Sequence, residues 1–294
     1  MKVPTILLLS ILALLSALVY PTLISSSGES RSHDASTAPT GSESWTDEHY
    51  QSVLENVDQA GMVDYRDLKR DRESLDKFAL QLSTLPRSTY DSWDDKSKIS
   101  FWINAYNGLT LLAITDNYPI ESSFLRSLRY PKNSIRQISG VWDSLNFQVM
   151  GQPITLEEIE HGILRAQFEE PRIHVALVCA AMGCPPLRNE PYEGSRLDEQ
   201  LNDQANRFFG DPKKFRIDRG TNTVYLSRIL DWFGEDFIDQ YQKPGFRESD
   251  IEEGAILEFA IRSVSSEAAE YLEKKSYAVE FLDYDWTLNE QVYD

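Results

Sequence analysis

The stretch Pro171-Arg-Ile-His-Val-Ala-Leu-Val-Cys-Ala-Ala-Met-Gly-Cys-Pro-Pro-Leu187 carries both cysteines of the chain and one of its four histidines. Its first part, Ile173 to Val178, is short and mostly β-branched or aliphatic, and turn residues follow at Gly183 to Pro186. This pattern predicts a buried strand that ends in a tight turn. Because reactive side chains gather at the end of that strand, we expect a functional site there.

Strand geometry limits which histidine can serve a thiol. His174 lies five residues before Cys179, so in a strand the two side chains would point to opposite faces, about 16 Å apart. A direct pair along the strand is therefore not expected, and His174 is interpreted as a structural histidine with a satisfied hydrogen bond. His161, which a separate helix would bring, is the expected base.

The helix that carries His161 has the clearest local signature in the chain. Thr155-Leu-Glu-Glu158 is a capping box, which predicts a helix over 155–167. Glu157, His161 and Arg165 are spaced by four residues, so a carboxylate could lie beside the imidazole and fix its tautomer. An exposed polar stripe would give the same spacing, and both interpretations stay open.

A third helix is predicted from Asp94 to about Asn117, and its centre is apolar on nearly all sides. Such a helix is expected in the middle of the fold. Asn104 and Asn107 share one of its faces, where each amide needs hydrogen-bond partners. They either fix a neighbouring loop or orient a catalytic histidine or an oxyanion.

The rest of the chain completes an α+β fold. Apolar residues at helical spacing predict helices, and alternating runs around turn residues predict short strands. We therefore predict a predominantly helical single domain over residues 45–294 with a small antiparallel sheet. The further predicted elements are helices over 45–60, 71–85, 121–128, 195–209, 250–264 and up to 275, and strands over 145–150, 153–154, 215–218, 223–227 and 278–282.

The N-terminal segment has a composition of its own. Thr5 to Ile24 is an uncharged apolar run behind Lys2, which predicts a membrane anchor or a signal peptide over residues 1–24. Residues 25–44 are rich in Ser, Thr and Gly and are typical of a flexible linker. Either type of segment would place the folded part outside the cytoplasm, in the cell envelope.

The net charge of the chain indicates which kinds of binding partner to expect. The chain of 294 residues has a formal net charge of −18. An acidic surface repels phosphate backbones, so we expect no nucleic-acid partner. A peptide or protein partner in the envelope, of basic character, fits the charge better.

Cys179 and Cys184 allow three interpretations. The first interpretation is that one cysteine is a nucleophile. It would need activation by His161 or His174, because a free thiol is only slightly ionised at neutral pH. Alternatively, the two cysteines with His161 and His174 could bind zinc. A disulfide is the third possibility, for which the chain must turn sharply between the cysteines.

Five motifs follow one another along the chain: Phe101–Asn107, Ile159–Arg165, Ile173–Leu187, Leu226–Trp232 and Tyr284–Asn289. Together they resemble the DUF547 family, a domain of unknown function, and occur in the family's order. Bacterial members resemble exported or membrane-attached proteins, and plant members attach the domain to a leucine-zipper region. The resemblance implies that Glu160, His161, His174, Cys179, Cys184 and Arg228 matter.

A relation to papain-like thiol hydrolases would need a circular permutation, because all four histidines precede both cysteines. Our leading hypothesis is an envelope-located, thiol-dependent hydrolase or acyl transferase acting on peptide or amide bonds, without a cofactor. Its catalytic residues would be Cys179 or Cys184, His161 and Glu160. The supporting residues would be His174, Asn104, Asn107 and Arg228. The alternative is a non-catalytic binding or scaffold domain stabilised by zinc or by a Cys179–Cys184 disulfide.

Overall fold

A computed structural model describes residues 45–242 and 251–292, and these described residues form one compact unit. The apolar segment over 1–24 and the linker over 25–44 lie outside the described residues. Within the described part, none of the helices combines the length and apolar character needed to cross a membrane.

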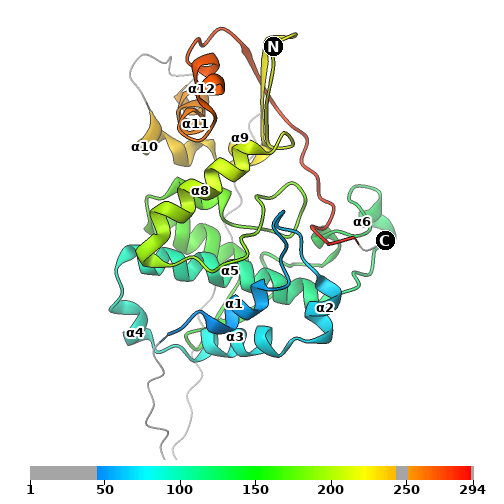
Figure 1. Ribbon diagram of the computed structural model, residues 1–294. Helices are drawn as coiled ribbons and strands as arrows, with labels where there is room; N and C mark the ends of the chain where they lie inside the picture. The colour runs from blue at the N-terminus through cyan, green and yellow to red at the C-terminus, as the bar shows by residue number, and fades with distance from the viewer. Residues whose placement is uncertain (1–44, 243–250, 293–294) are drawn as a thin grey trace, which may run out of the picture. The chain divides into compact units, whose positions relative to one another are not determined.

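Helix α5 (Asp95–Asn117) lies at the centre of the first core (Figure 1). The Asp94 carboxylate accepts a hydrogen bond from the Ser97 N–H at 2.8 Å and caps its N-terminus. Nearly every side chain from Ile99 to Thr115 is buried, as the apolar pattern predicts. The helices that pack on it include α1 (Glu48–Leu54), α2 (Tyr65–Arg70) and α3 (Glu73–Thr84).

Two small sheets accompany the helices. Strands β1 (Phe147–Val149) and β2 (Gln152–Ile154) form the predicted antiparallel hairpin. In the second sheet, β3 (Phe215–Asp218) and β4 (Thr223–Leu226) form the other predicted hairpin, and β5 (Ala278–Phe281) pairs with β4 in parallel. The α+β, mostly helical prediction is confirmed, but the second sheet is mixed rather than purely antiparallel.

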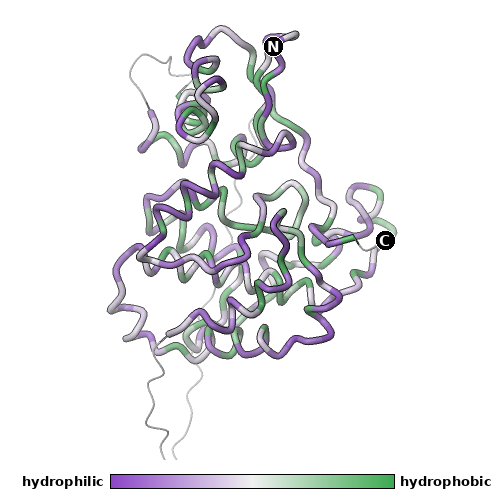
Figure 2. The backbone as a smooth tube through the Cα atoms, viewed as in Figure 1, coloured by the Kyte–Doolittle hydropathy of each residue, from purple (hydrophilic) through white to green (hydrophobic). Residues whose placement is uncertain are grey.

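The remaining helices surround these elements. Helix α8 (Leu197–Gly210) lies beside the site, and the helices after β4 build a second core with the mixed sheet. Figure 2 shows that hydrophobic and hydrophilic stretches alternate along the backbone in both parts. The other elements are α4 (Arg87–Asp91), α6 (Phe124–Ser127), η1 (Ile135–Gln137), η2 (Glu158–Leu164), α7 (Arg165–Gln167), η3 (Pro171–Val175), η4 (Gly194–Arg196), α9 (Arg228–Trp232), η5 (Gly234–Phe237), α10 (Ile238–Tyr241), α11 (Ile251–Ile261) and α12 (Ser266–Leu272).

The predicted strand over Ile173 to Val178 is wrong, although its burial is confirmed. The chain forms the short 3-10 helix η3 and then a loop. The polar backbone groups of that loop are satisfied by one side chain instead of a neighbouring strand, because Asn107 bonds both Ala176 and Val178. The separation of about 16 Å expected between His174 and Cys179 in a strand therefore does not apply.

This stretch also joins the two cores. Val175 packs in the second core, and most residues from Ala176 to Cys184 pack in the first. The cysteines thus lie at the boundary between the two packed regions.

Candidate active site at the paired cysteines

A sharp turn brings the two cysteines side by side. Ala180 adopts a left-handed conformation with φ of 59°, and the Cys184 N–H donates to the Ala181 carbonyl at 2.9 Å. The Cys179 N–H donates to Cys184 Sγ at 3.0 Å. Both thiols are free. The predicted turn between the cysteines is confirmed.

A segment from the other end of the chain covers this turn. The Gly183 N–H donates to the Asp285 carbonyl at 2.7 Å, and the Met182 N–H donates to the Thr287 carbonyl at 2.7 Å. Any Cβ on Gly183 would lie 2.7 Å from the Tyr284 ring, so only glycine allows this close approach. The Tyr284 hydroxyl is 3.1 Å from Cys179 Sγ and 3.0 Å from Cys184 Sγ.

These contacts shift the pKa values of the two thiols in opposite directions. A hydrogen bond with Cys184, together with burial, raises the pKa of the Cys179 thiol well above its usual range. Burial alone raises the pKa of Cys184 too, but hydrogen bonds from Cys179, Tyr284 and nearby backbone outweigh it and lower that pKa. Burial also raises the pKa of Tyr284 well above its usual range, so its hydroxyl remains a donor. Cys179 is therefore the thiol that holds its proton more firmly, and it remains a thiol at neutral pH.

His174 is buried against the same site and held by a carboxylate. Its Nε2 lies 2.7 Å from Asp236 Oδ2, and its ring stacks on Phe233 with centroids 4.1 Å apart and planes 12° apart. The prediction of a histidine with a satisfied hydrogen bond is confirmed. Since Nε2 is bonded to Asp236, Nδ1 is the nitrogen left for other chemistry.

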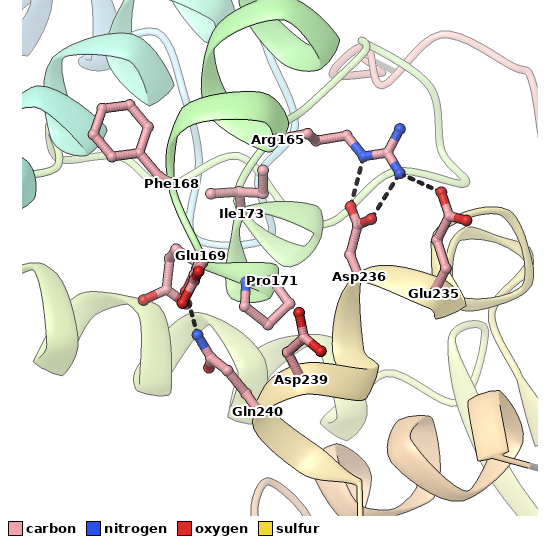
Figure 3. A pocket seen from close by; sticks show the side chains of 10 residues that line it. Arg165, Phe168, Glu169, Pro171, Ile173, Glu235, Asp236, Asp239 and Gln240 are labelled. Carbon is pink, nitrogen blue, oxygen red and sulfur yellow. Dashed lines mark hydrogen bonds and ion pairs between the residues drawn. The ribbon is translucent and has the colours of Figure 1, made fainter.

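Arg165 fixes that carboxylate from its other side. Its Nε and Nη2 donate to the two Asp236 oxygens at 2.6 and 2.7 Å, and Nη2 also donates to Glu235 at 2.9 Å (Figure 3). Burial raises the pKa of Asp236, but the hydrogen bonds from Arg165 and His174 outweigh it and hold the pKa well below its ordinary value. Asp236 is therefore an anion at neutral pH and keeps a proton on His174 Nε2.

His161 is exposed and has a different kind of partner. The capping box is confirmed, since the Thr155 N–H donates to Glu158 at 2.8 Å and the Glu158 N–H donates to Thr155 Oγ1 at 3.1 Å. The helix after it, η2, has π geometry. Arg165 Nη1 lies 2.9 Å from His161 Nδ1. Because arginine only donates, Nδ1 accepts and neutral His161 carries its proton on Nε2.

Most of the predicted site residues line a single pocket, which we call the thiol pocket. Its volume is about 300 Å³, at the small end of the range for ligand sites. Arg165 and Asp236 line a different, neighbouring cavity of about 310 Å³, which Figure 3 shows. The thiol pocket is lined by Tyr106, Arg136, Trp142, Glu160, His161, His174, Leu177, Cys179, Cys184, Ile229, Trp232, Phe233 and Trp286.

Comparison with known proteins identifies part of the chain. Residues 90–209 match the model of the DUF547 family, described as a protein of unknown function. This segment is a DUF547 domain. The family resemblance is confirmed over these residues, and no curated protein and no solved structure matches the chain. The permuted papain-like arrangement therefore stays a prediction.

The DUF547 domain contains both cysteines, both pocket histidines and Glu160. Two of the motifs, Leu226–Trp232 and Tyr284–Asn289, lie beyond the matched residues. They supply Trp232 and Trp286 to the pocket and the Tyr284 hydroxyl to the sulfurs. The site therefore extends beyond the matched segment.

Asn104 and Asn107 act as fixed links between α5 and two loops of the domain. Asn104 Nδ2 donates to the Tyr192 carbonyl at 2.9 Å, and Asn104 Oδ1 accepts from the Tyr192 N–H at 2.9 Å. Asn107 bonds the Ala176 carbonyl at 3.0 Å and the Val178 N–H at 2.8 Å. Both asparagines fix neighbouring loops, and only Asn107 holds the segment that leads into Cys179.

Arg228 does not line the thiol pocket. It donates to Asp231 at 2.9 Å and to the Phe281 carbonyl at 3.1 Å, so it ties α9 to β5. Glu160 lines the pocket and forms a hydrogen bond with Tyr106. Both residues were implied by the family motifs. Arg228 links two elements outside the pocket, whereas Glu160 lies in the pocket wall.

The four proposed zinc ligands line the pocket but do not form a metal cluster. Within residues 45–242 and 251–292, no three His, Cys, Asp or Glu side chains are grouped to hold a metal ion. His174 Nε2 is bonded to Asp236, and His161 Nδ1 is bonded to Arg165. The zinc interpretation therefore has no support in the geometry.

Asp236, Tyr284 and Arg136 are the site residues that the sequence reasoning missed. Asp236 is separated from His174 by 62 residues, and Tyr284 from Cys184 by 100. The one available signal was the motif around Tyr284, which marked the segment without giving the tyrosine a role.

Proposed function

We propose that the protein is a thiol-dependent hydrolase or acyl transferase acting on peptide, amide or related acyl bonds. In this proposal Cys179 is the nucleophile, His174 is the base and Asp236 orients the base. The observation that carries it is that His174, which lines the same pocket as Cys179, is bonded through Nε2 to Asp236 at 2.7 Å. A nucleophile, a base and a group that orients the base form the arrangement shared by thiol and serine hydrolases.

Cys179 is favoured over Cys184 because a substrate can reach it. Cys184 is 4% exposed, whereas Cys179 is only partly buried. The raised pKa of Cys179, caused first by its hydrogen bond with Cys184 and then by burial, keeps it a thiol at neutral pH. Such a thiol needs a base during attack, and His174 provides one with a fixed tautomer.

The reaction proceeds in two balanced steps. His174 Nδ1 takes the Cys179 proton while Sγ attacks the acyl carbon, and the amine or alcohol then leaves with that proton. A thioester to Cys179 remains. Water, or an acceptor nucleophile, next gives its proton to His174, bonds to the acyl carbon and displaces the sulfur. The departing sulfur takes that proton back from His174, which restores the thiol and the neutral imidazole and releases the acid or the transferred acyl product.

Tyr284 provides the donor closest to the reacting sulfur. Its hydroxyl lies 3.1 Å from Cys179 Sγ and stays protonated because burial raises its pKa. A hydrogen bond from this hydroxyl to the developing oxyanion would stabilise the transition state. The same hydroxyl bonds Cys184, so Cys184 positions Tyr284 and Cys179 without contacting the substrate.

The extracytoplasmic location belongs to the same proposal. Its support is the apolar run from Thr5 to Ile24 and the polar segment that follows it. A fusion of residues 1–44 to a reporter that is active only outside the cytoplasm tests this part. An inactive reporter would contradict it.

The chemistry is tested with the full-length protein and p-nitrophenyl acetate, a generic activated ester. We expect release of p-nitrophenol and an acetyl adduct on Cys179, found by peptide mass mapping. Cys179→Ser should abolish both, while Cys184→Ser should retain the adduct. Unchanged turnover in Cys179→Ser, or an adduct found only on Cys184, would contradict the assignment.

A further inference from the structure

Arg136 is a cation in the wall of the thiol pocket with aromatic rings around it. It comes from η1 (Ile135–Gln137), and its guanidinium carbon lies 4.5 Å from the Tyr130 ring centroid, 4.7 Å from that of Trp286 and 5.3 Å from that of Trp142. Arg136 Nη2 donates to the Tyr130 hydroxyl at 2.6 Å. These contacts hold the guanidinium in one place.

Within residues 45–242 and 251–292, no carboxylate forms an ion pair with this guanidinium. No Asp or Glu of the described residues lies within 4.0 Å of it, whereas Arg165 and Arg172, for example, each form ion pairs. This is notable in a chain with a net charge of −18. A partly buried, unpaired guanidinium at a pocket is a natural site for an anion.

Ring stacking leaves the donors of Arg136 available. Aromatic rings contact the flat faces of a guanidinium, while its N–H groups point outward in the plane. One of these N–H groups is used by Tyr130. The others can bind a carboxylate, in the paired geometry that arginine favours.

A continuous aromatic wall connects this cation to the reacting sulfur. The Arg136 guanidinium packs on Trp286, whose ring centroid is 4.5 Å from that of Tyr284, and the Tyr284 hydroxyl is 3.1 Å from Cys179 Sγ. All of this lies in or beside a cavity of about 300 Å³. A ligand that touches the sulfur can therefore place an anionic group at Arg136 only if the two parts of the ligand are a few bonds apart.

From this geometry we propose that Arg136 selects acyl substrates with a carboxylate close to the reacting bond. This inference rests on the proposed thiol chemistry. A compact peptide or N-acyl amino acid, with its free carboxylate on Arg136 and its apolar side chain against Trp142, Trp232 and Trp286, meets these requirements. Glu160 lines the same pocket and repels an anion, so it favours placing the carboxylate at the Arg136 side.

Two alkylating reagents of nearly the same shape test the inference without any turnover. Iodoacetate carries a carboxylate next to its reacting carbon, and iodoacetamide carries a neutral amide there. The ratio of their alkylation rates at Cys179 measures the effect of nearby charge on an anionic reagent. The rates are measured in the Cys184→Ser variant, in which Cys179 is the sole remaining cysteine. If that variant does not fold, the rates are measured in the wild type, and peptide mass mapping shows which cysteine carries the adduct.

We expect Arg136→Gln to lower the iodoacetate-to-iodoacetamide ratio by about 3- to 10-fold, because one charge at the pocket wall is lost. Arg136→Lys keeps the charge and should retain most of the ratio. Arg219→Gln, in an exposed ion pair with Glu267, is the control for net charge. A purely structural role of Arg136 would change both reagents alike and leave the ratio intact.

The outcomes separate this inference from the proposed function. A ratio that is unchanged in Arg136→Gln overturns the anion site, even if the wild type turns over p-nitrophenyl acetate. A ratio that falls in Arg136→Gln, but not in Arg219→Gln, supports the anion site even if the ester is not turned over. In the latter case the proposed hydrolase or transferase activity fails while the anion site remains.

Discussion

His174 and His161 line the same pocket, but their surroundings differ. His174 is buried, stacks on Phe233 and is bonded to the Asp236 anion. His161 is exposed on a helix with π geometry, and its partner is the Arg165 cation. Arg165 takes part in both arrangements: it donates to His161 Nδ1, and it donates to Asp236, which is in turn bonded to His174.

The difference shows which histidine is prepared for proton transfer. A carboxylate stabilises the imidazolium that forms when a histidine accepts a proton, whereas a guanidinium opposes it. The sequence favoured His161 because the expected strand would have kept His174 away from Cys179, whereas a separate helix could bring His161 to the thiol. In the structure, the support reaches His174 instead, from a residue in a different part of the chain.

The strongest test of which histidine is the base is to replace His174 and His161 separately. His174→Gln should lower the rate of Cys179 acetylation by about 10²- to 10⁴-fold, the usual contribution of a general base. His161→Gln should lower it by less than about 10-fold. The measurement is the pre-steady-state release of p-nitrophenol, and a larger loss in His161→Gln would reverse the assignment of the base.

A second comparison uses the two asparagines of α5, which form matched links to different loops. Asn107→Ala and Asn104→Ala should each lower the free energy of unfolding by about 2–3 kcal/mol, because each leaves buried backbone groups unsatisfied. Denaturant unfolding measures this loss. Only Asn107→Ala should also speed the alkylation of Cys179, since it releases the segment before the cysteine. Equal alkylation rates in the two variants would show that this segment does not set the position of Cys179.

Asp236 provides a test through pH. Its pKa is held below the ordinary value near 3.8, by Arg165 and His174 acting against burial, so the stabilisation is complete above that value and is lost as the pH falls below it. The melting temperature of Asp236→Asn should therefore lie below that of the wild type from pH 8 to pH 5. The difference should shrink only below about pH 4. A difference that disappears between pH 7 and pH 5 would mean that another group controls it.

The smallest expected effect concerns the cysteine pair. The hydrogen bond with Cys184 is the main cause that raises the pKa of Cys179, and burial comes second. Cys184→Ala should lower the pKa of Cys179 and raise its alkylation rate by iodoacetamide at pH 7, by about 10-fold for each unit of pKa. A slower rate would show that Cys184 activates Cys179 rather than restraining it.

Local features of this fold could be predicted from the sequence, and contacts between distant segments could not. The capping box at Thr155, the central helix α5 and the hairpin of β3 and β4 each depend on neighbouring residues, and all three are confirmed. The apolar run after Pro171 is buried, as predicted. The predicted strand was wrong because burial alone does not show what hydrogen-bonds to the backbone N–H and C=O groups. Here the side chain of Asn107 does so instead of a neighbouring strand.

The candidate site shows the same limit. The motifs marked Cys179, Cys184, His161, His174 and Glu160, and the structure brings all five to one pocket. Asp236 gave no local signal, because its importance arises only where η5 meets η3 and α7. Arg136 was equally hidden, since an arginine in a loop-rich stretch is ordinary until three aromatic rings are found around it.

The cover that Tyr284 forms over the thiols has a consequence for biosynthesis. The turn with the cysteines is made 100 residues before the tyrosine that bonds both sulfurs. At the usual rate of translation this is an interval of roughly 5 to 20 seconds. During that time the nascent chain carries two thiols without their hydroxyl partner, open to oxidants and to mispairing. The two sulfurs therefore acquire their hydroxyl partner only near the end of synthesis, well after the turn that pairs them has been made.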